Sequence, residues 1–532
     1  MADNRSLGLA RAAPAWHCWA MPFDSLRDFL DHLERRERLT RVAAPVAAAL
    51  EITEIQTRLL AEGGPAVLFD NVTDAAGQRY AMPVVANLFG TVERVAWGMG
   101  REPNELRKLG EMLAWLDHPE PPESLREAFA LLPMLKTALA RKPKTVSSAP
   151  CQEIVLKGAD IDLTKLPIQT CWPGEPAPLI SFPLVTTRGP DVGGPDGKTR
   201  PGGDNVGIYR MQVTGKNTAL MRWLHTRGGA LHYAAWKAQH GANGAPMPAA
   251  VTIGADPAVL LAAVTPVPEG LSEYEFAGLL RGKRVKLVEC KTVPLKVPAS
   301  AEIVIEGHVS LSETGAEGPY GDHTGYYNSV ERFPVFTASA ITMRRDAVYL
   351  STFTGRPPDE PSVLGLALND VFLPMFARQF PEVVDFYLPP EACSYRIAVV
   401  SIRKQYPGHA KRAMMAVWSY LRQFLYTKMV IVVDEDINAR DWKDVMWALA
   451  TRFDPSRDVT IIDNTPIDYL DFASPEPELG GKIGLDATNK IGSETSREWG
   501  KPIRMSDDII DAVSKKWPGL GLPGSGAPIW KK

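Results

Sequence analysis

The sequence predicts a mixed fold of helices and sheets, α/β in class, arranged in three modules. Helical patterns alternate with short strand-like runs in residues 21–144 and again in 346–505, as is typical of α/β modules. Residues 145–345 instead consist mainly of short strand-like runs separated by turn residues, which favours a sandwich or a barrel. With 532 residues, 45% of them hydrophobic, the chain can bury several cores.

Residues 1–20 lack the compact apolar run of a secretory signal, and we expect them to form a disordered extension. The protein then starts either at Met1 or at Met21. Apolar residues at helical spacing predict a helix over 23–33, with Ser25 as its N-cap. Two short strands are expected after it, at 66–69 and 83–86.

The elements of the other two modules follow from the same patterns. In the β-rich module, strands are expected at 153–157, 182–188, 206–213, 219–224, 285–289, 301–309 and 336–343. The glycine-rich segment 187–204 is a lid or only a linker. In the last module, helices are expected at 361–380 and 410–425, and buried strands at 395–402 and 429–433. In the tail, 506–532, apolar residues at helical spacing predict a helix that docks on a neighbouring surface.

Composition argues against several classes of protein. The net charge is -3 and no block of Lys or Arg is present, so nucleic acid is not an expected partner. The five cysteines form no CxxC pair, which argues against a zinc cluster or a disulfide framework. No apolar run reaches the ~18 residues of a membrane span. The GxxxxGK[ST] and GxGxxG signatures are absent, which disfavours a P-loop kinase and a dinucleotide-binding enzyme.

The segment Glu317–Tyr327 carries two carboxylates, Glu317 and Asp322, five positions apart. Pro319 and the glycines around it are incompatible with a regular helix and favour a tight turn that directs both acids to one point. Two such carboxyl groups push their pKa values apart, so one can keep a proton near neutral pH and act as a general acid. The alternative is a solvated loop whose acids cap neighbouring backbone.

Two other segments combine arginines with glycines and an amide. Arg210 closely follows Asn205, whereas Arg222 and Arg227 precede a Gly-Gly pair. The three guanidinium groups could hold an anion. Oxygen ligands from Asn205 and Glu273 would suit a hard cation such as Mg²⁺ or Mn²⁺ rather than zinc. Taken singly, Arg210 and Arg222 are better explained as surface strand residues, and Glu273 as an acid at a helix N-terminus, but the nearby Asn205 and the Gly-Gly pair weaken the surface interpretation of the arginines.

Together these segments resemble the UbiD-type decarboxylases, and the match is closest to the bacterial 4-hydroxy-3-polyprenylbenzoate decarboxylases of ubiquinone biosynthesis. The resemblance runs from about Met21 to near Arg504. It depends on six dispersed motifs that occur in order, whereas any one of them would be weak. They are Asn205–Val213, Met221–Gly229, Leu271–Tyr274, Glu317–Tyr327, Thr354–Pro361 and Gln405–Arg412.

The resemblance implies a central split-barrel domain that binds prenylated FMN. It also implies a divalent metal, Mn²⁺ in family members, that bridges the cofactor phosphate, and a monovalent cation such as K⁺ nearby. A separate flavin prenyltransferase would supply the cofactor. Carried over to this sequence, the metal ligands are Asn205 and Glu273, and the catalytic residues are Glu317, Arg210 and Asp322. The implied cofactor contacts are Ile208, Tyr209, Arg210, Arg222, Trp223, Leu224, Arg227 and Gly228.

One departure from the family affects the metal site. Family members commonly place a histidine directly before Arg-Gly-Gly, where this sequence has Thr226, and His225 lies one position earlier. In a strand, one position means the opposite face, so His225 is not assigned as a ligand. The third ligand is then another group or a water, unless the backbone shifts locally.

The reaction that the resemblance implies is the non-oxidative decarboxylation of 4-hydroxy-3-polyprenylbenzoate to 2-polyprenylphenol. Asp322 would deliver the proton that replaces CO₂, while Arg210 and Glu317 set its position and protonation state. A polyprenyl tail implies an apolar groove and transient contact of a cytoplasmic enzyme with the inner face of the cell membrane. The family assembles into dimers or hexamers.

Three alternatives to this function remain at the level of the sequence. The first is the same chemistry on another aromatic or α,β-unsaturated carboxylic acid. The second is a metal-dependent hydrolase that uses Glu317 and Asp322. The third is a structural subunit in which the acidic turn only closes a loop.

Overall fold

The computed structural model describes residues 23–117, 141–193, 199–200, 202–265, 271–420 and 422–528. The expected extension over residues 1–20 and the alternative start at Met21 lie outside these residues. The chain divides into two compact units, Met1–Met375 and Phe376–Lys532. Within the described ranges, no helix combines the length and the apolar character that a membrane span requires.

A small sheet with helices opens the first unit. Its elements are α1 (Leu26–Arg35), β1 (Leu39–Val42), β2 (Val46–Ala47), α2 (Glu51–Ala61), β3 (Ala66–Phe69), β4 (Val72–Thr73), β5 (Val84–Ala86), α3 (Val92–Gly98), α4 (Leu106–Asp117) and β20 (Tyr349–Leu350). The sheet has the order β1-β3-β5-β20. As predicted, Ser25 caps α1, because its hydroxyl accepts the backbone N–H of Asp28. The apolar face of α1, with Leu26 and Phe29, is fully buried.

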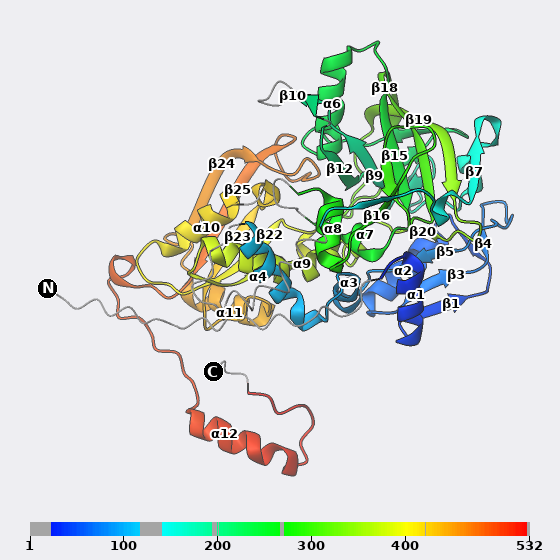
Figure 1. Ribbon diagram of the computed structural model, residues 1–532. Helices are drawn as coiled ribbons and strands as arrows, with labels where there is room; N and C mark the ends of the chain where they lie inside the picture. Colours follow the sequence, from blue (N-terminus) through cyan, green and yellow to red (C-terminus); the bar gives the residue numbers. More distant parts are fainter. Residues whose placement is uncertain are drawn as a thin grey trace, which may run out of the picture. The chain divides into compact units, whose positions relative to one another are not determined.

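The β-rich part of the first unit is one large sheet (Figure 1). Its strands are β7 (Ile154–Lys157), β8 (Leu179–Ile180), β9 (Leu184–Arg188), β12 (Asp204–Ile208), β13 (Met211–Val213), β14 (Thr218–Met221), β15 (Met247–Ile253), β18 (Ile303–Glu317) and β19 (Glu331–Met343). They run in the order β12-β9-β15-β18-β19-β14-β13-β8, and β7 pairs with β19.

This strand order determines where the site lies. β12 is at one end of the order and β13 is next to the other end, yet only Tyr209 and Arg210 separate them along the chain. A link of this length reaches only ~10 Å, so the sheet has to curl on itself. The strand predicted over 206–213 is therefore two strands, and Arg210 lies in the link between them.

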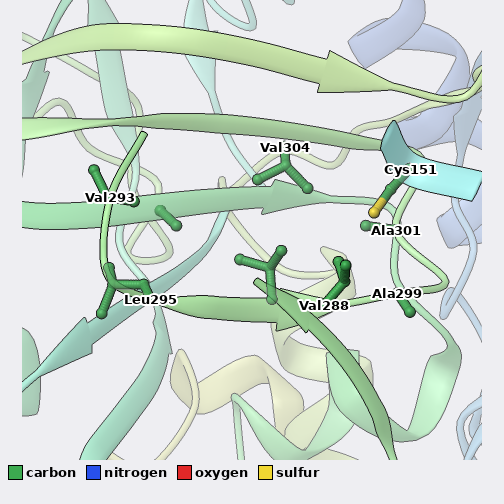
Figure 2. Packing of buried hydrophobic residues seen from close by; sticks show 9 residues of the cluster. Cys151, Val288, Val293, Leu295, Ala299, Ala301 and Val304 are labelled. Atoms are coloured by element: carbon green, nitrogen blue, oxygen red, sulfur yellow. The ribbon is translucent and has the colours of Figure 1, made fainter. Parts of the chain in front are cut away.

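Helices and a second sheet cover the large sheet. These elements are β6 (Lys144–Val146), β10 (Val192–Gly193), β11 (Thr199–Arg200), α6 (Gly228–His240), α7 (Pro257–Ala262), α8 (Glu273–Arg281), β16 (Lys286–Glu289) and β17 (Lys296–Pro298). Figure 2 shows the apolar cluster that joins the β17-β16-β6 sheet to the large sheet through Ala250 of β15 and Val304 of β18. Its other members are Cys151, Val288, Val293, Leu295, Val297, Ala299 and Ala301.

The second unit is an α/β sheet module. Its elements are β21 (Val383–Tyr387), β22 (Ile397–Ile402), α10 (His409–Tyr420), β23 (Met429–Asp434), α11 (Trp442–Arg452), β24 (Val459–Pro466), β25 (Leu479–Ala487) and α12 (Asp507–Lys516), and α9 (Glu360–Gln379) crosses the boundary. In the order β21-β22-β23-β25-β24 the three central strands are parallel. β22 and β23 are rich in buried branched apolar residues, which is typical of strands covered on both faces.

Two predictions for the second unit were wrong in part. The helix expected over 410–425 ends at Tyr420, and Arg422–Tyr426 forms a separate 3-10 turn. In the tail, α12 forms as predicted, but only Ile510 is buried, while Ile509 and Val513 are exposed. The expected docking face of this helix is therefore largely uncovered in the chain described.

Candidate active site

Arg210 joins the two carboxylates of the acidic turn. Its Nε donates to Glu317 Oε1 at 2.9 Å, and its Nη1 donates to Asp322 Oδ2 at 2.9 Å. Its Nη2 donates to Glu317 Oε2 at 3.3 Å and to Asn328 Oδ1 at 2.8 Å. Because Arg210 lies where the large sheet curls, its side chain reaches both the end of β18 and the turn that follows. The structure thus brings together all three residues that were expected to be catalytic.

The acidic segment forms the tight turn that its glycines and proline predict. Glu317 is the last residue of β18 and is completely buried. Gly318 follows with a φ of 93°, a conformation that few other residues adopt. Asp322 N–H donates to the carbonyl of Tyr326 at 3.0 Å, and the N–H of Gly325 donates back to the carbonyl of Asp322 at 2.8 Å. Since both acids bind an arginine and neither is exposed, the turn is not a solvated loop, although Asp322 Oδ1 does accept the backbone N–H of His323 at 2.8 Å.

Aromatic side chains hold this turn in place. A Cβ on Gly321 would collide with the indole of Trp172, so only glycine fits there. The indole N–H of Trp172 donates to the carbonyl of Thr354 at 2.8 Å, and the Thr354 hydroxyl donates to the carbonyl of Gly321 at 2.9 Å. The Tyr320 hydroxyl donates to the carbonyl of Ala177 at 2.8 Å. Three chain segments therefore fix the position of Asp322.

The charge state of Asp322 differs from the prediction. Burial by itself would raise the pKa of this carboxyl, but hydrogen bonding to His323 and the positive charge of Arg210 outweigh burial and lower its pKa well below the usual range. His323 Nδ1 lies 2.9 Å from Asp322 Oδ1. The expectation that one of the two acids keeps a proton near neutral pH is therefore wrong for Asp322 in this arrangement, because Arg210 lies between the two acids.

A different carboxyl group near the turn does bind a proton near neutral pH. Burial raises the pKa of Glu175 to about 7. Its Oε2 accepts the backbone N–H of Cys171 at 2.6 Å, and its Oε1 accepts the N–H of Gly321 at 3.4 Å. Glu175 thus contacts the backbone of the turn one residue before Asp322.

Arg222 takes part in the same charge network. Its guanidinium was expected to contact the cofactor, yet its Nη1 donates to Glu317 Oε2 at 3.2 Å and its side chain is only 5% exposed. Its guanidinium also lies over the ring of Phe333, 5.3 Å from the ring centroid. Glu317 is consequently held by two arginines.

The two residues expected to bind a metal lie side by side. Glu273 is the first residue of α8, whose N-cap is Ser272, and its Oε2 accepts the N–H of Val206 at 3.0 Å. Asn205 directly precedes Val206, and a Cβ on Gly228 would collide with Asn205 Oδ1. Burial raises the pKa of Glu273, and among the described residues no cation forms an ion pair with it. A divalent metal would supply the missing positive charge, so this donor pair fits one.

The N-terminus of α6 lies against the same residues. Gly229 N–H donates to the hydroxyl of Tyr209 at 3.0 Å, and Asn205 Nδ2 donates to it at 3.3 Å. The indole N–H of Trp223 is buried without an acceptor in the described part of the chain, and a Cβ on Gly229 would lie 2.5 Å from it. A buried donor, a helix N-terminus and the N-cap Arg227 form a cradle that fits a phosphate group.

The remaining predicted residues flank this cradle. Ile208 ends β12, and Leu224 is half-buried beyond β14. β14 ends at Met221, so His225 and Thr226 lie in a turn rather than in a strand, and the argument from opposite strand faces does not apply to them. In the described ranges, no three His, Cys, Asp or Glu side chains are grouped as metal ligands.

The sequence reasoning missed two residues of the site. Asn328 lies one position beyond the acidic motif, and its Oδ1 accepts from both Arg210 and Tyr320 N–H. Glu175 lies in a Pro- and Gly-rich loop, a weak signal for a buried acid.

Known proteins share this architecture. The chain matches three domain families described as the N-terminal domain (residues 30–113), the Rift-related domain (144–357) and the C-terminal domain (362–487) of the 3-octaprenyl-4-hydroxybenzoate carboxy-lyase UbiD. The UbiD-class enzyme HmfF from Pelotomaculum thermopropionicum, solved with FMN, is 32% identical with a TM-score of 0.74, and the match covers 92% of this chain and 98% of that one. The vanillic acid decarboxylase of Sedimentibacter hydroxybenzoicus, in closed form, is 28% identical with a TM-score of 0.78, covering 94% and 100%.

Fold and site together define an enzyme whose buried arginine–carboxylate network lies at the closing point of a curled sheet. The three matched domains cover most of the chain and follow one another in order. The chain belongs to the UbiD family, and it is a carboxy-lyase.

Proposed function

We propose that this protein decarboxylates an aromatic acid with prenylated FMN as its cofactor, and that its substrate is 4-hydroxy-3-polyprenylbenzoate, which it converts to 2-polyprenylphenol. The observation that most supports the proposal is the arrangement of Glu317, Arg210 and Asp322 as one hydrogen-bonded network. An evolved dimeric form of the Pelotomaculum enzyme, 31% identical over 92% of this chain, has been solved with prFMN.

The residues around the N-terminus of α6 are the proposed binding site for the cofactor phosphate and the metal. Trp223, the N-terminus of α6 and Arg227 would hold the cofactor phosphate, and Asn205 and Glu273 would hold Mn²⁺ beside it, with a monovalent cation such as K⁺ nearby. When bound, prenylated FMN supplies the electron sink that loss of CO₂ from a ring carbon requires. Two protein ligands are too few for a closed site, so the phosphate and water would complete the metal's coordination.

Asp322 is the proposed proton donor. Arg210 and His323 hold this carboxyl ionised in the structure, so a proton has to reach it within each catalytic cycle. Glu317 would keep Arg210 oriented, and Arg210 would in turn fix Asp322. This arrangement does not favour a hydrolase that uses the two acids as metal ligands, because the guanidinium groups of Arg210 and Arg222 already bind their carboxylate oxygens.

The cofactor is tested by mass spectrometry of the protein after co-expression with a flavin prenyltransferase, its proposed supplier. The expected result is a bound flavin whose mass exceeds that of FMN by one prenyl group, together with about one Mn²⁺ per chain. Recovery of unmodified FMN alone, or of no flavin, would count against the proposal.

The substrate is tested with a panel of acids. We expect 4-hydroxy-3-polyprenylbenzoates to be consumed at least ~10-fold more efficiently, by kcat/KM, than vanillic acid or 3,4-dihydroxybenzoic acid, because only they carry a polyprenyl tail that could add apolar contacts to the enzyme. The reverse preference would favour the rival substrate class. The proposal also includes a cytoplasmic location with peripheral contact to the inner face of the membrane, and vesicle flotation tests this contact. It further includes a homo-oligomeric state, which light scattering tests.

A further inference from the structure

The pairing of β18 with β19 sets two glutamates against each other. Glu317 and Glu331 are directly opposite in the antiparallel register. Glu317 is completely buried, whereas the side chain of Glu331 is 42% exposed. Like charges in directly opposed positions destabilise a sheet. The structure therefore needs a compensating charge at the end of these strands.

Arg222 supplies this charge from the neighbouring strand. It follows the last residue of β14, which pairs with β19. Its Nη1 lies 3.2 Å from Glu317 Oε2, and its Nη2 lies 3.9 Å from Glu331 Oε2. Its backbone N–H donates to the carbonyl of Arg210 at 3.3 Å, so the two arginines are also joined through the main chain.

From this geometry we propose that Arg222 is a positioning residue for decarboxylation: it binds Glu317 together with Arg210 and holds this carboxylate in place, so that Arg210 keeps its contact with Asp322. The inference rests on the proposed function. In the network, the two guanidinium groups of Arg210 and Arg222 face two carboxylates, Glu317 and Asp322. Without Arg222, the single guanidinium of Arg210 would have to balance both acids. Asp322, whose pKa is lowered by His323, Arg210 and Arg222 together, would then bind a proton more readily.

Several charged or titratable groups face Glu317 from the surrounding elements, and the pH dependence of activity would reflect all of them. Arg210 comes from the link between β12 and β13, Arg222 from the end of β14, and Glu331 from β19. Asp322 is connected through Arg210. Tyr320 also belongs to this group, since its ring lies beneath the Arg210 guanidinium, 5.2 Å from the ring centroid.

The test compares Arg222→Met, Arg222→Lys and the wild type as holoenzymes, with kcat and KM measured from about pH 5 to pH 9. For Arg222→Met we expect kcat to fall by about 100-fold and the pH optimum to move up by about 1–2 units, with KM and flavin content unchanged. Arg222→Lys should recover most of kcat and the original optimum. An unchanged pH profile, or loss of flavin instead of kcat, would overturn the proposal.

A matched control separates positioning from simple destabilisation. The side chain of Arg281 is also 5% exposed and is paired with the completely buried Asp256. Arg281→Met should lower the melting temperature to a similar extent without moving the pH optimum. If it moved the optimum as far as Arg222→Met does, the effect would be one of stability, and the proposal would be wrong.

A second measurement decides the role of Arg222 even if no substrate is found. Melting temperatures of the wild type, Arg222→Met, Glu317→Gln and the double variant form a cycle. We expect Arg222→Met to lower the melting temperature by several degrees when it is made in the wild-type sequence. In the Glu317→Gln variant it should lower the melting temperature by less than half as much, because the arginine has already lost its partner there. Equal losses in both backgrounds would show that Arg222 does not act through Glu317.

Discussion

At the scale of single residues, the site is governed by which group holds which charge. The sequence identified Glu317 and Asp322, because acids in a Pro- and Gly-rich segment are conspicuous. The charge state of Asp322 was not predictable, since it depends on His323 and Arg210, whose positions arise only from the fold. The same holds for Glu175, whose burial cannot be inferred from its neighbours in the sequence.

Glu175 should make stability depend on pH. Burial raises its pKa from the usual value of 4.5 to about 7, so the folded chain keeps this proton where the unfolded chain has lost it. The stability is fully present below about pH 4.5 and decreases as the pH rises to about 7, by about 3 kcal/mol in total. In Glu175→Gln this dependence should disappear, so the stability of the variant should increase relative to that of the wild type as the pH rises from 4.5 to 8. Melting temperatures across this range measure the difference, and a constant difference would contradict the account.

Glu273 should determine the metal content. Glu273→Gln is expected to lower the Mn²⁺ content of the co-expressed protein by about 10- to 100-fold, because it replaces the charged member of the proposed ligand pair with a neutral amide. Elemental analysis of the purified protein measures this. Glu275→Gln is the matched control, since Glu275 lies in the same first turn of α8 but has other partners: its Oε2 accepts the Ser272 N–H at 3.2 Å, and its Oε1 lies 3.9 Å from Arg141 Nε. Equal metal contents in the two variants would refute the assignment.

At the scale of elements, the turn after β18 depends both on its local sequence and on tertiary contacts. Its glycines and proline predicted a turn, and the structure has one at the expected place. The precise position of the turn depends instead on the indole of Trp172, 149 positions upstream of Gly321. Likewise, the residues 206–213 have the composition of one strand, and only the closure of the sheet explains why they form two.

Gly321→Ala should therefore impair catalysis more than folding. The added Cβ would collide with Trp172 and displace the turn, and a displacement of ~1 Å costs about 100-fold in rate. The measurement is kcat with saturating substrate. Gly365→Ala is the control, because a Cβ at Gly365 in α9 meets nothing within 4 Å and should leave kcat unchanged. Similar activities for both variants would show that the turn tolerates movement.

At the scale of the whole molecule, every residue proposed to bind the cofactor, the metal or the reacting proton lies in the unit Met1–Met375. The alternation of elements in the sequence predicted an α/β, β-rich and α/β succession, and the mixed fold is confirmed. The boundary between the two compact units at residue 375 lies inside α9 and was not predicted, because a continuous helix carries no boundary signal in its sequence.

Cofactor loading should stabilise the two units unequally. A ligand stabilises only what binds it, by about 4 kcal/mol at a concentration 1,000-fold above its Kd. Calorimetry of protein prepared with and without the prenyltransferase should therefore show one transition that moves upward and one that does not. Equal shifts of all transitions would contradict a site confined to the first unit.

The central claim is that Asp322 protonates the ring carbon that loses CO₂. Its most direct test is CO₂ release by wild type and Asp322→Asn, both co-expressed with the flavin prenyltransferase and matched for flavin content, on the same 4-hydroxy-3-polyprenylbenzoate. We expect the variant to be at least ~100-fold slower with its flavin retained, because the proton donor is gone. Release of CO₂ by Asp322→Asn at the wild-type rate would contradict the claim.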